Sequence, residues 1–154
     1  MKYLRLVGVL LVALLAIGVL IAPIGPVPGF FIGGTAATAP ATWLDTSSVH
    51  EVRLRVPGTL PRVVIIWVVE HAGDLHVVGS RDSGWVSRIG AGSPVELRLG
   101  DDTYALRAVP VDAGYDGVLE AYVAKYKADY PDIIAGFPAI ADARETVGVF
   151  RLER

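Results

Sequence analysis

The chain has 154 residues and no cysteine, with 14 basic and 16 acidic residues and a formal net charge of −2. This length suits one domain with an appendage, and the lack of cysteine excludes disulfides and thiolate metal sites. Without Lys2 and Arg5, 12 basic residues remain against 16 acidic ones, so the concentrated positive surface of a nucleic-acid-binding protein is absent.

The first segment of the chain is strongly apolar. Residues 6–24 contain no charge, and apart from Pro23 they are all Leu, Val, Ile, Ala or Gly. At about 1.5 Å per residue, a helix of this length approaches the roughly 30 Å of a bilayer core. We therefore predict a transmembrane signal anchor within residues 1–32 that contacts membrane lipid through residues 6–24. A cleaved signal peptide is the alternative.

The charges that flank this segment predict its orientation. Lys2 and Arg5 precede it, and no Lys or Arg follows it before Arg53. The positive-inside rule then predicts a single-pass membrane protein with a cytoplasmic N-terminus and a domain outside the cytoplasm. A cytoplasmic domain remains the alternative.

Proline and glycine mark the end of the apolar helix. Pro23, Pro26 and Pro28 alternate with Gly25 and Gly29, residues that are unfavourable within a helix. Residues 33–48 are expected to form a linker. Trp43, within this linker, is either an interfacial anchor or the first residue of a core.

Residues 49–154 have the pattern of one β-rich domain. Val52, Leu54 and Val56 alternate with charged residues, which predicts a strand with one wet face. The strands expected from such patterns cover residues 49–56, 63–69, 75–79, 95–99, 103–111 and 147–152. A short helix is expected over 85–90, and a longer one begins near an N-cap at Asp116 and ends before Pro131. The fold class is mainly β with one long helix, arranged as a six- to seven-stranded antiparallel split barrel.

The segment from Gly79 to Gly90 holds the most informative polar residues. Hydroxyls, glycines and arginines precede a short helix, as in sites where backbone amides and guanidinium groups bind a phosphate. This interpretation assigns the contacts to Ser80, Arg81, Ser83 and Arg88. The alternative is a loop in which Asp82 or Ser83 caps the helix and Arg81 pairs with Asp82 or with solvent.

The order V-V-G-S-R-D-S-G-W, a short helix, S-P-V-E-L-R-L-G-D, a hairpin and a helix with Y-x-x-K-Y-x-x-x-Y resembles the flavin- or deazaflavin-binding split barrels. This family includes pyridoxamine phosphate oxidase and the deazaflavin-dependent nitroreductases. The resemblance implies FMN or a deazaflavin as cofactor and a barrel that often forms dimers. It implies cofactor contacts from residues that lie in the matching segments: Arg62, Ser80, Arg81, Ser83, Gly84, Trp85 and Arg88.

Three tyrosines recur every four residues on the expected long helix, at Tyr122, Tyr126 and Tyr130. In the similar nitroreductases, helix tyrosines border the substrate pocket. The resemblance therefore implies Tyr126 or Tyr130 as catalytic residues that orient a nitro or quinone oxygen. The alternative is an aromatic stripe packed on the barrel.

Two functions remain open from the sequence. The first is a membrane-anchored, flavin- or deazaflavin-dependent reductase that acts on a hydrophobic quinone-like or nitro acceptor. The second is a non-catalytic binding module or accessory subunit, and its main support is that Pro57 to Arg62 lacks the Lys and Ser of the family's G-R-K-S-G-x-x-R element. The expected partner is a second copy of the chain or a membrane protein. The three histidines have no metal-ligand spacing, so no metal is predicted.

Overall fold

The fold was obtained as a computed structural model, which describes residues 2–21 and 29–154. The predicted end of the apolar span at Ile24 and the prolines at 23, 26 and 28 lie outside the described residues. The helices are α1 (Lys2–Ile21), α2 (Gly84–Ile89), α3 (Tyr115–Tyr126), α4 (Pro131–Ala135) and the 3-10 helix η1 (Ile140–Glu145). The strands are β1 (Thr35–Ala37), β2 (Glu51–Val56), β3 (Arg62–His71), β4 (Asp74–Ser80), β5 (Ser93–Leu99), β6 (Asp102–Pro110) and β7 (Val147–Glu153).

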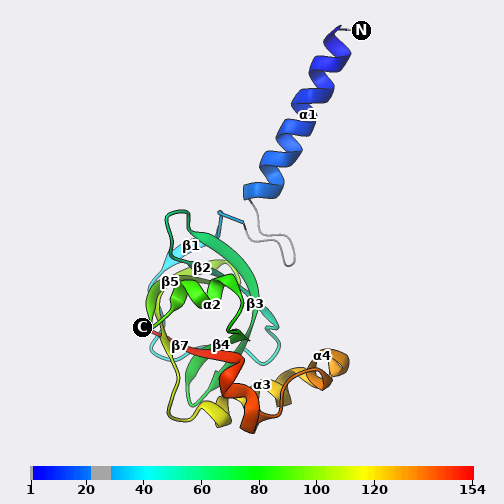
Figure 1. The fold of residues 1–154 in the computed structure, drawn as a ribbon. Coiled ribbons are helices and arrows are strands. Elements are labelled where there is room, and N and C mark those ends of the chain that lie inside the picture. Colours follow the sequence, from blue (N-terminus) through cyan, green and yellow to red (C-terminus); the bar gives the residue numbers. More distant parts are fainter. Residues whose placement is uncertain (1, 22–28) are drawn as a thin grey trace.

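Six of the strands form an antiparallel barrel (Figure 1). The sheet runs in the order β1-β6-β5-β2-β3-β4-β7, and a further pairing between β6 and β7 closes it. Consecutive hairpins produce this arrangement, because strands joined by short turns pair with their neighbours in sequence. The six-stranded barrel and the hairpins expected from period-two patterning are confirmed.

Strand β3 joins the two halves of the barrel. Its first part pairs with β2, ending at the pair Glu51–Trp67, and its last part pairs with β4, beginning at the pair Val68–Val77. The backbone of Val68 therefore lies just beyond the end of β2. Where a strand has no neighbouring strand, its backbone N–H and C=O groups need other hydrogen-bond partners.

Residues 33–48, expected to be a linker, contribute to the barrel. Strand β1 pairs in parallel with the first residues of β6, while the last residues of β6 pair with β7. Trp43 is 5% exposed and belongs to the barrel core, where its ring meets Tyr104 edge-on at 5.3 Å. Of the two roles considered for Trp43, the structure shows the core residue.

The alternating residues fill the interior of the barrel. Val52, Leu54 and Val56 of β2 are buried and pack with apolar residues of β4 and β5. Burial of each such side chain contributes about 1.5–3 kcal/mol. This core accounts for the stability of a domain that has no disulfides.

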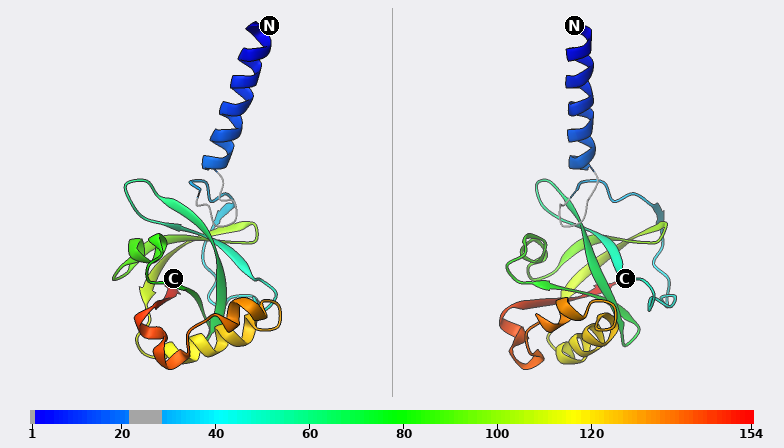
Figure 2. Two further views of the ribbon diagram at one scale, coloured as in Figure 1. Left: turned by 45° about the vertical axis from the view of Figure 1, so that its right-hand side comes forward. Right: turned by 90° about the vertical axis from the view of Figure 1, so that its right-hand side faces the viewer.

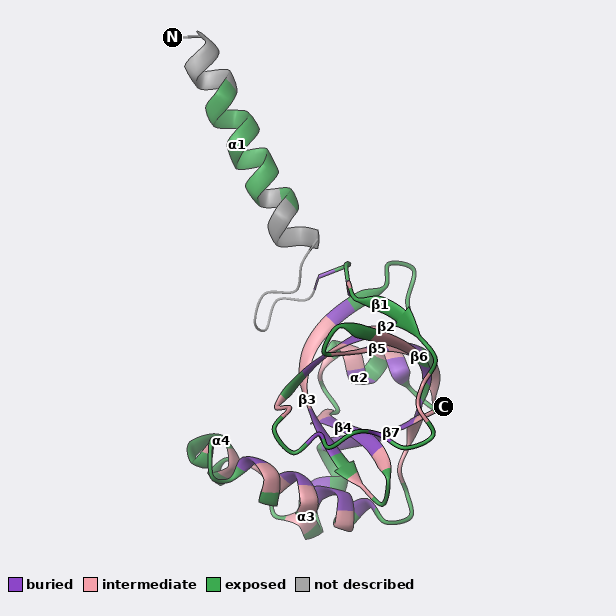
Figure 3. Cartoon of the chain, turned by 180° about the vertical axis from the view of Figure 1, so that it is seen from behind, coloured by how far each residue is buried: buried purple, intermediate pink, exposed green. Residues whose placement is uncertain are grey.

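A second apolar cluster lies outside the barrel, between the sheet and α3. Figure 3 shows buried residues along the face of α3 that meets the sheet. The helix begins after Gly114, whose φ of 77° is left-handed, so the predicted N-cap at Asp116 is wrong. Asp116 instead lies in the first turn, where a carboxylate is favoured by the helix dipole. The helix ends at Tyr126, and Pro131 begins α4, where a missing amide proton has no cost.

Helix α1 lies apart from the barrel in the views of Figures 1 and 2. Those of its side chains that the structure describes are largely exposed, including Val9, Leu11 and Leu15 at 70%, 61% and 73%. Among the helices of the described residues, none is long and apolar enough to cross a membrane.

His76 of β4 is a buried polar residue. It is 4% exposed, and burial lowers the pKa of its imidazole to about 4. In the unfolded chain the His76 imidazole becomes protonated as the pH falls below 6.5, whereas in the folded chain it becomes protonated only near pH 4. We therefore expect the free energy of unfolding to decrease by on the order of 2 kcal/mol as the pH falls through this window.

Urea unfolding of the His76→Met variant checks this assignment, since methionine fills a similar volume without titrating. The variant should show a flatter dependence of stability on pH between 6.5 and 4. An unchanged slope would show that another group is responsible.

Candidate functional site

The loop expected to bind an anion connects β4 to α2 and is held by its own hydroxyls. The Ser83 hydroxyl donates to the carbonyl oxygen of Ser80 at 2.7 Å. The Ser80 hydroxyl accepts the amide of Asp82 at 3.3 Å. Ser83 precedes α2 as its N-cap residue, without a capping hydrogen bond from its side chain. These hydroxyls stabilise the turn itself.

The arginines of the predicted site bond to backbone carbonyls. Arg81 Nε donates to the carbonyl of Arg144 at 2.9 Å, which ties the loop to η1. Arg88 Nη1 donates to the carbonyls of Pro57 and Leu60 at 3.0 and 3.1 Å, which ties α2 to the β2–β3 loop. Arg62 is exposed at the start of β3.

Trp85 packs on the barrel rather than over a pocket. Its ring covers Gly79, where an added Cβ would lie 2.3 Å from Cζ2 of the indole. The ring also meets Phe150 at 5.9 Å between centroids. Gly84, another predicted cofactor contact, is not packed in this way, because a Cβ added there would meet no atom within 4 Å.

The structure does not bring the predicted cofactor residues together. Ser80 lines a pocket beside Tyr122, and Arg81 lines a different hollow beside Ser87 and Phe150. Arg88 is directed to the β2–β3 loop. This arrangement does not fit a single phosphate bound by these side chains.

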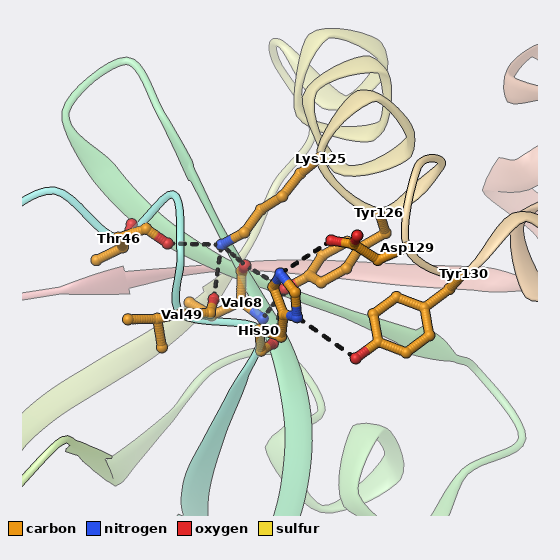
Figure 4. Close-up of polar contacts among 8 residues, drawn as sticks. All are labelled: Thr46, Val49, His50, Val68, Lys125, Tyr126, Asp129 and Tyr130. Carbon is orange, nitrogen blue, oxygen red and sulfur yellow. Dashed lines mark hydrogen bonds and ion pairs between the residues drawn. The ribbon is translucent and has the colours of Figure 1, made fainter.

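Tyr126, one of the two predicted catalytic tyrosines, is fully buried at 0% exposure. Its hydroxyl lies 2.6 Å from the carbonyl oxygen of Val68 and 2.7 Å from that of His50, and it accepts the Val68 amide at 3.0 Å (Figure 4). Burial raises the pKa of this hydroxyl, so it stays protonated. The hydroxyl satisfies the backbone where β3 extends beyond β2.

Tyr130, the other predicted catalytic residue, belongs to a polar array at the surface. Its hydroxyl lies 3.4 Å from Nδ1 of His50, and Nε2 of His50 lies 3.2 Å from a carboxylate oxygen of Asp129 (Figure 4). The His50 and Asp129 side chains are 33% and 55% exposed. The array joins the segment between α3 and α4 to the residue before β2.

Lys125 makes three hydrogen bonds to backbone carbonyls. Its ammonium donates to the carbonyls of Thr46, Val49 and Val68 at 2.9, 2.8 and 2.8 Å (Figure 4). Burial lowers its pKa, and the carboxylates of Asp45 and Glu70 partly oppose that effect. No local pattern indicates this role, because the three carbonyls come from segments far from Lys125 in the chain.

A pocket of about 430 Å³ lies between the end of β4, α3 and the segment that follows α4. Its walls are largely apolar, and no charged residue lines it; the lining residues are Val78, Gly79, Ser80, Tyr122, Ile133, Gly136, Phe137, Pro138, Thr146 and Val147. The hydroxyls of Tyr115 and Tyr126 bond to backbone carbonyls, whereas Tyr122 lines this pocket. Burial raises the pKa of Tyr122, which keeps its hydroxyl as a donor.

Over residues 2–21 and 29–154, no group of three or more His, Cys, Asp or Glu side chains is placed to hold a metal ion.

No protein-family model matches the chain, and no curated protein matches it significantly. Among solved structures it is similar to HutZ, the heme storage protein from Vibrio cholerae, with 14% identity, a TM-score of 0.50 and coverage of 70% of this chain and 83% of HutZ. A NimC/NimA family protein from Clostridium acetobutylicum is 17% identical over 67% of this chain and 71% of its own, with a TM-score of 0.46. A protein of unknown function from Agrobacterium tumefaciens is 14% identical over 74% and 58%, also with a TM-score of 0.46. The likeness to HutZ is one of fold, and the expected split β-barrel is thereby confirmed.

Proposed function

We propose that this protein is a membrane-attached binding module that holds a small, neutral, largely apolar molecule in the pocket between β4, α3 and α4. The observation that carries this proposal is the pocket of about 430 Å³ itself, which is largely apolar, has no charged residue in its lining and is lined by Tyr122 and Phe137. Apolar walls with a few polar groups are typical of small-molecule sites.

The lining of the pocket defines the class of ligand. Because no charged side chain lines it, a charged ligand would lose its hydration without gaining a partner. Phe137 offers an aromatic face, and Tyr122 offers one donor. A quinone or a nitro compound meets these requirements, since each has a flat apolar body and an accepting oxygen.

The membrane attachment is proposed for residues 6–24, a segment that continues past Ile21, the last residue of α1. Residues 6–24 carry no charge, and the side chains that the structure describes in α1 expose apolar surface. Lys2 and Arg5 precede this segment, which favours a cytoplasmic N-terminus and a barrel on the other side of the membrane.

Quenching of tryptophan fluorescence by 2-methyl-1,4-naphthoquinone tests the ligand site. Trp67 lies 5.9 Å from the Tyr122 ring, so it reports on this region. We expect saturable quenching, and we expect Tyr122→Phe to weaken binding by roughly 5- to 10-fold, the effect of one hydrogen bond of about 1 kcal/mol.

Two further variants make the test specific. Gly136 lines the pocket with a φ of −83°, so Gly136→Leu fits the backbone and fills the space; it should abolish saturable quenching. Ala135→Leu adds the same side chain at an exposed neighbour and should leave binding unchanged. Quenching that stays linear in quinone concentration, or is equal in all variants, would exclude this site.

The second candidate is a reductase that uses FMN or a deazaflavin to reduce a quinone-like or nitro acceptor. The split-barrel fold is compatible with a bound cofactor, because HutZ, which shares that fold, is a heme storage protein. The contacts of Arg81, Arg88 and Ser83 with backbone carbonyls weigh against it. Absorption spectra of the purified protein after addition of FMN, a deazaflavin or hemin decide the matter, since a bound cofactor shifts its visible bands.

A further inference from the structure

The chain that follows α1 is fixed to the barrel over residues 29–37. Gly29 and Val63 exchange two backbone hydrogen bonds, of 2.9 and 2.7 Å. The Thr103 hydroxyl donates to the carbonyl of Gly33 at 2.6 Å. The amide of Thr35 donates to the carbonyl of Asp101 at 2.8 Å. The barrel is therefore held firmly to the end of the segment that leads from α1.

Within this segment, apolar side chains differ sharply in exposure. Ile32 is 9% exposed, and its carbonyl accepts hydrogen bonds from Arg53 and Arg98 at 3.4 and 3.2 Å. Phe30 and Phe31, immediately before it, are 44% and 62% exposed. Two adjacent phenyl rings thus remain in solvent on a well-fixed backbone.

The β2–β3 loop adds to the same surface. The Gly29–Val63 bridge places the two phenylalanines beside the start of β3, where Leu60 is 64% exposed and Arg62 is also exposed. In both views of Figure 2 this loop lies on the side of the barrel nearest α1, and α3 and α4 lie at the opposite end. We call Phe30, Phe31, Leu60 and Arg62 the α1-side surface.

The length of chain between α1 and the barrel limits their separation. Seven residues lie between Ile21 and Gly29, and a chain of this length spans no more than about 29 Å whatever its path. If the apolar segment is held in a bilayer, Phe30 and Phe31 stay within reach of the headgroup region, which adds about 5–8 Å on each side of the hydrocarbon core.

We propose that the barrel rests on the lipid surface through its α1-side surface, with Phe30, Phe31 and Leu60 among the headgroups and Arg62 on a lipid phosphate. This inference rests on the proposed attachment of α1. Apolar side chains gain free energy in the interfacial region, and a guanidinium binds phosphate through paired hydrogen bonds. The docked barrel turns α3 and α4 away from the bilayer, so the ligand pocket opens to the aqueous side.

Site-directed spin labelling tests this orientation, because the chain has no cysteine and each introduced one is unique. The full chain is placed in nanodiscs of phosphatidylcholine and phosphatidylglycerol, with a nitroxide at Phe31→Cys or Leu60→Cys. Ile133→Cys in α4 is the matched control, since Ile133 is 59% exposed at the far end. Leu11→Cys reports on α1 itself. Power saturation compares access of oxygen, which concentrates in lipid, with access of a water-soluble nickel chelate.

We expect labels at positions 31 and 60 to favour oxygen several-fold more than the label at 133. If the label at position 11 lies in lipid but those at 31 and 60 match the one at 133, the docking is overturned and the attachment stands. If the label at position 11 is also reached by nickel, both proposals are overturned.

Discussion

Replacing Lys125 by methionine should lower the free energy of unfolding by roughly 3 kcal/mol. The ammonium donates to three carbonyls, of Thr46, Val49 and Val68, and methionine leaves all three without that donor. Hydrogen bonds to a charged group contribute about 1.5–3 kcal/mol each, and the partial exposure of the site reduces their sum. Urea unfolding followed by circular dichroism measures the loss.

Lys127→Met is the control for this prediction. Lys127 is exposed two residues further along, so the same change of side chain there should alter stability by less than about 0.5 kcal/mol. Equal losses for the two variants would mean that helix propensity or net charge, and not the three carbonyls, sets the effect.

The second large effect is expected for Gly79→Ala, with a loss of roughly 2 kcal/mol. The new Cβ would lie 2.3 Å from Cζ2 and 2.9 Å from Cε2 of Trp85, so the indole must leave its place against Phe150. Overpacking of this kind costs about 1–3 kcal/mol, and the reduced entropy of the unfolded chain offsets part of it. A fall in melting temperature together with a red shift of tryptophan emission is the expected result.

Gly84→Ala supplies the matched comparison, because a Cβ at Gly84 meets no atom within 4 Å. That variant should be as stable as the parent or slightly more so. If Gly79→Ala proves equally harmless, Trp85 does not pack on β4 as described.

The fold was largely predictable because strand patterning is local. Val52, Leu54 and Val56 alternate with charged residues, and this alternation alone identifies one buried face. The start of α3 was misplaced because Asp116 is a common capping residue, whereas the turn is made by Gly114 in a left-handed conformation. Strand β1 was missed because its three small residues, Thr35–Ala37, show no period.

The candidate site was much less predictable, since it depends on contacts between distant segments. Tyr122 and Tyr126 are both tyrosines of the same four-residue repeat, so the sequence does not distinguish their roles. Only the packing of α3 does. Tyr126 is directed to the edge of β3, whereas Tyr122 lines the pocket. Likewise, nothing local to Arg88 indicates that Pro57 and Leu60, about thirty positions away, supply its hydrogen-bond acceptors.

The central claim, a neutral apolar ligand in the pocket beside Tyr122, is tested most directly by native mass spectrometry. The full chain is extracted from its own membrane in a mild detergent and compared with the Gly136→Leu and Ala135→Leu variants. We expect the parent and Ala135→Leu to carry the mass of one small, neutral molecule and Gly136→Leu to carry none. A parent that carries no added mass, or a Gly136→Leu variant that carries the same mass, would contradict it.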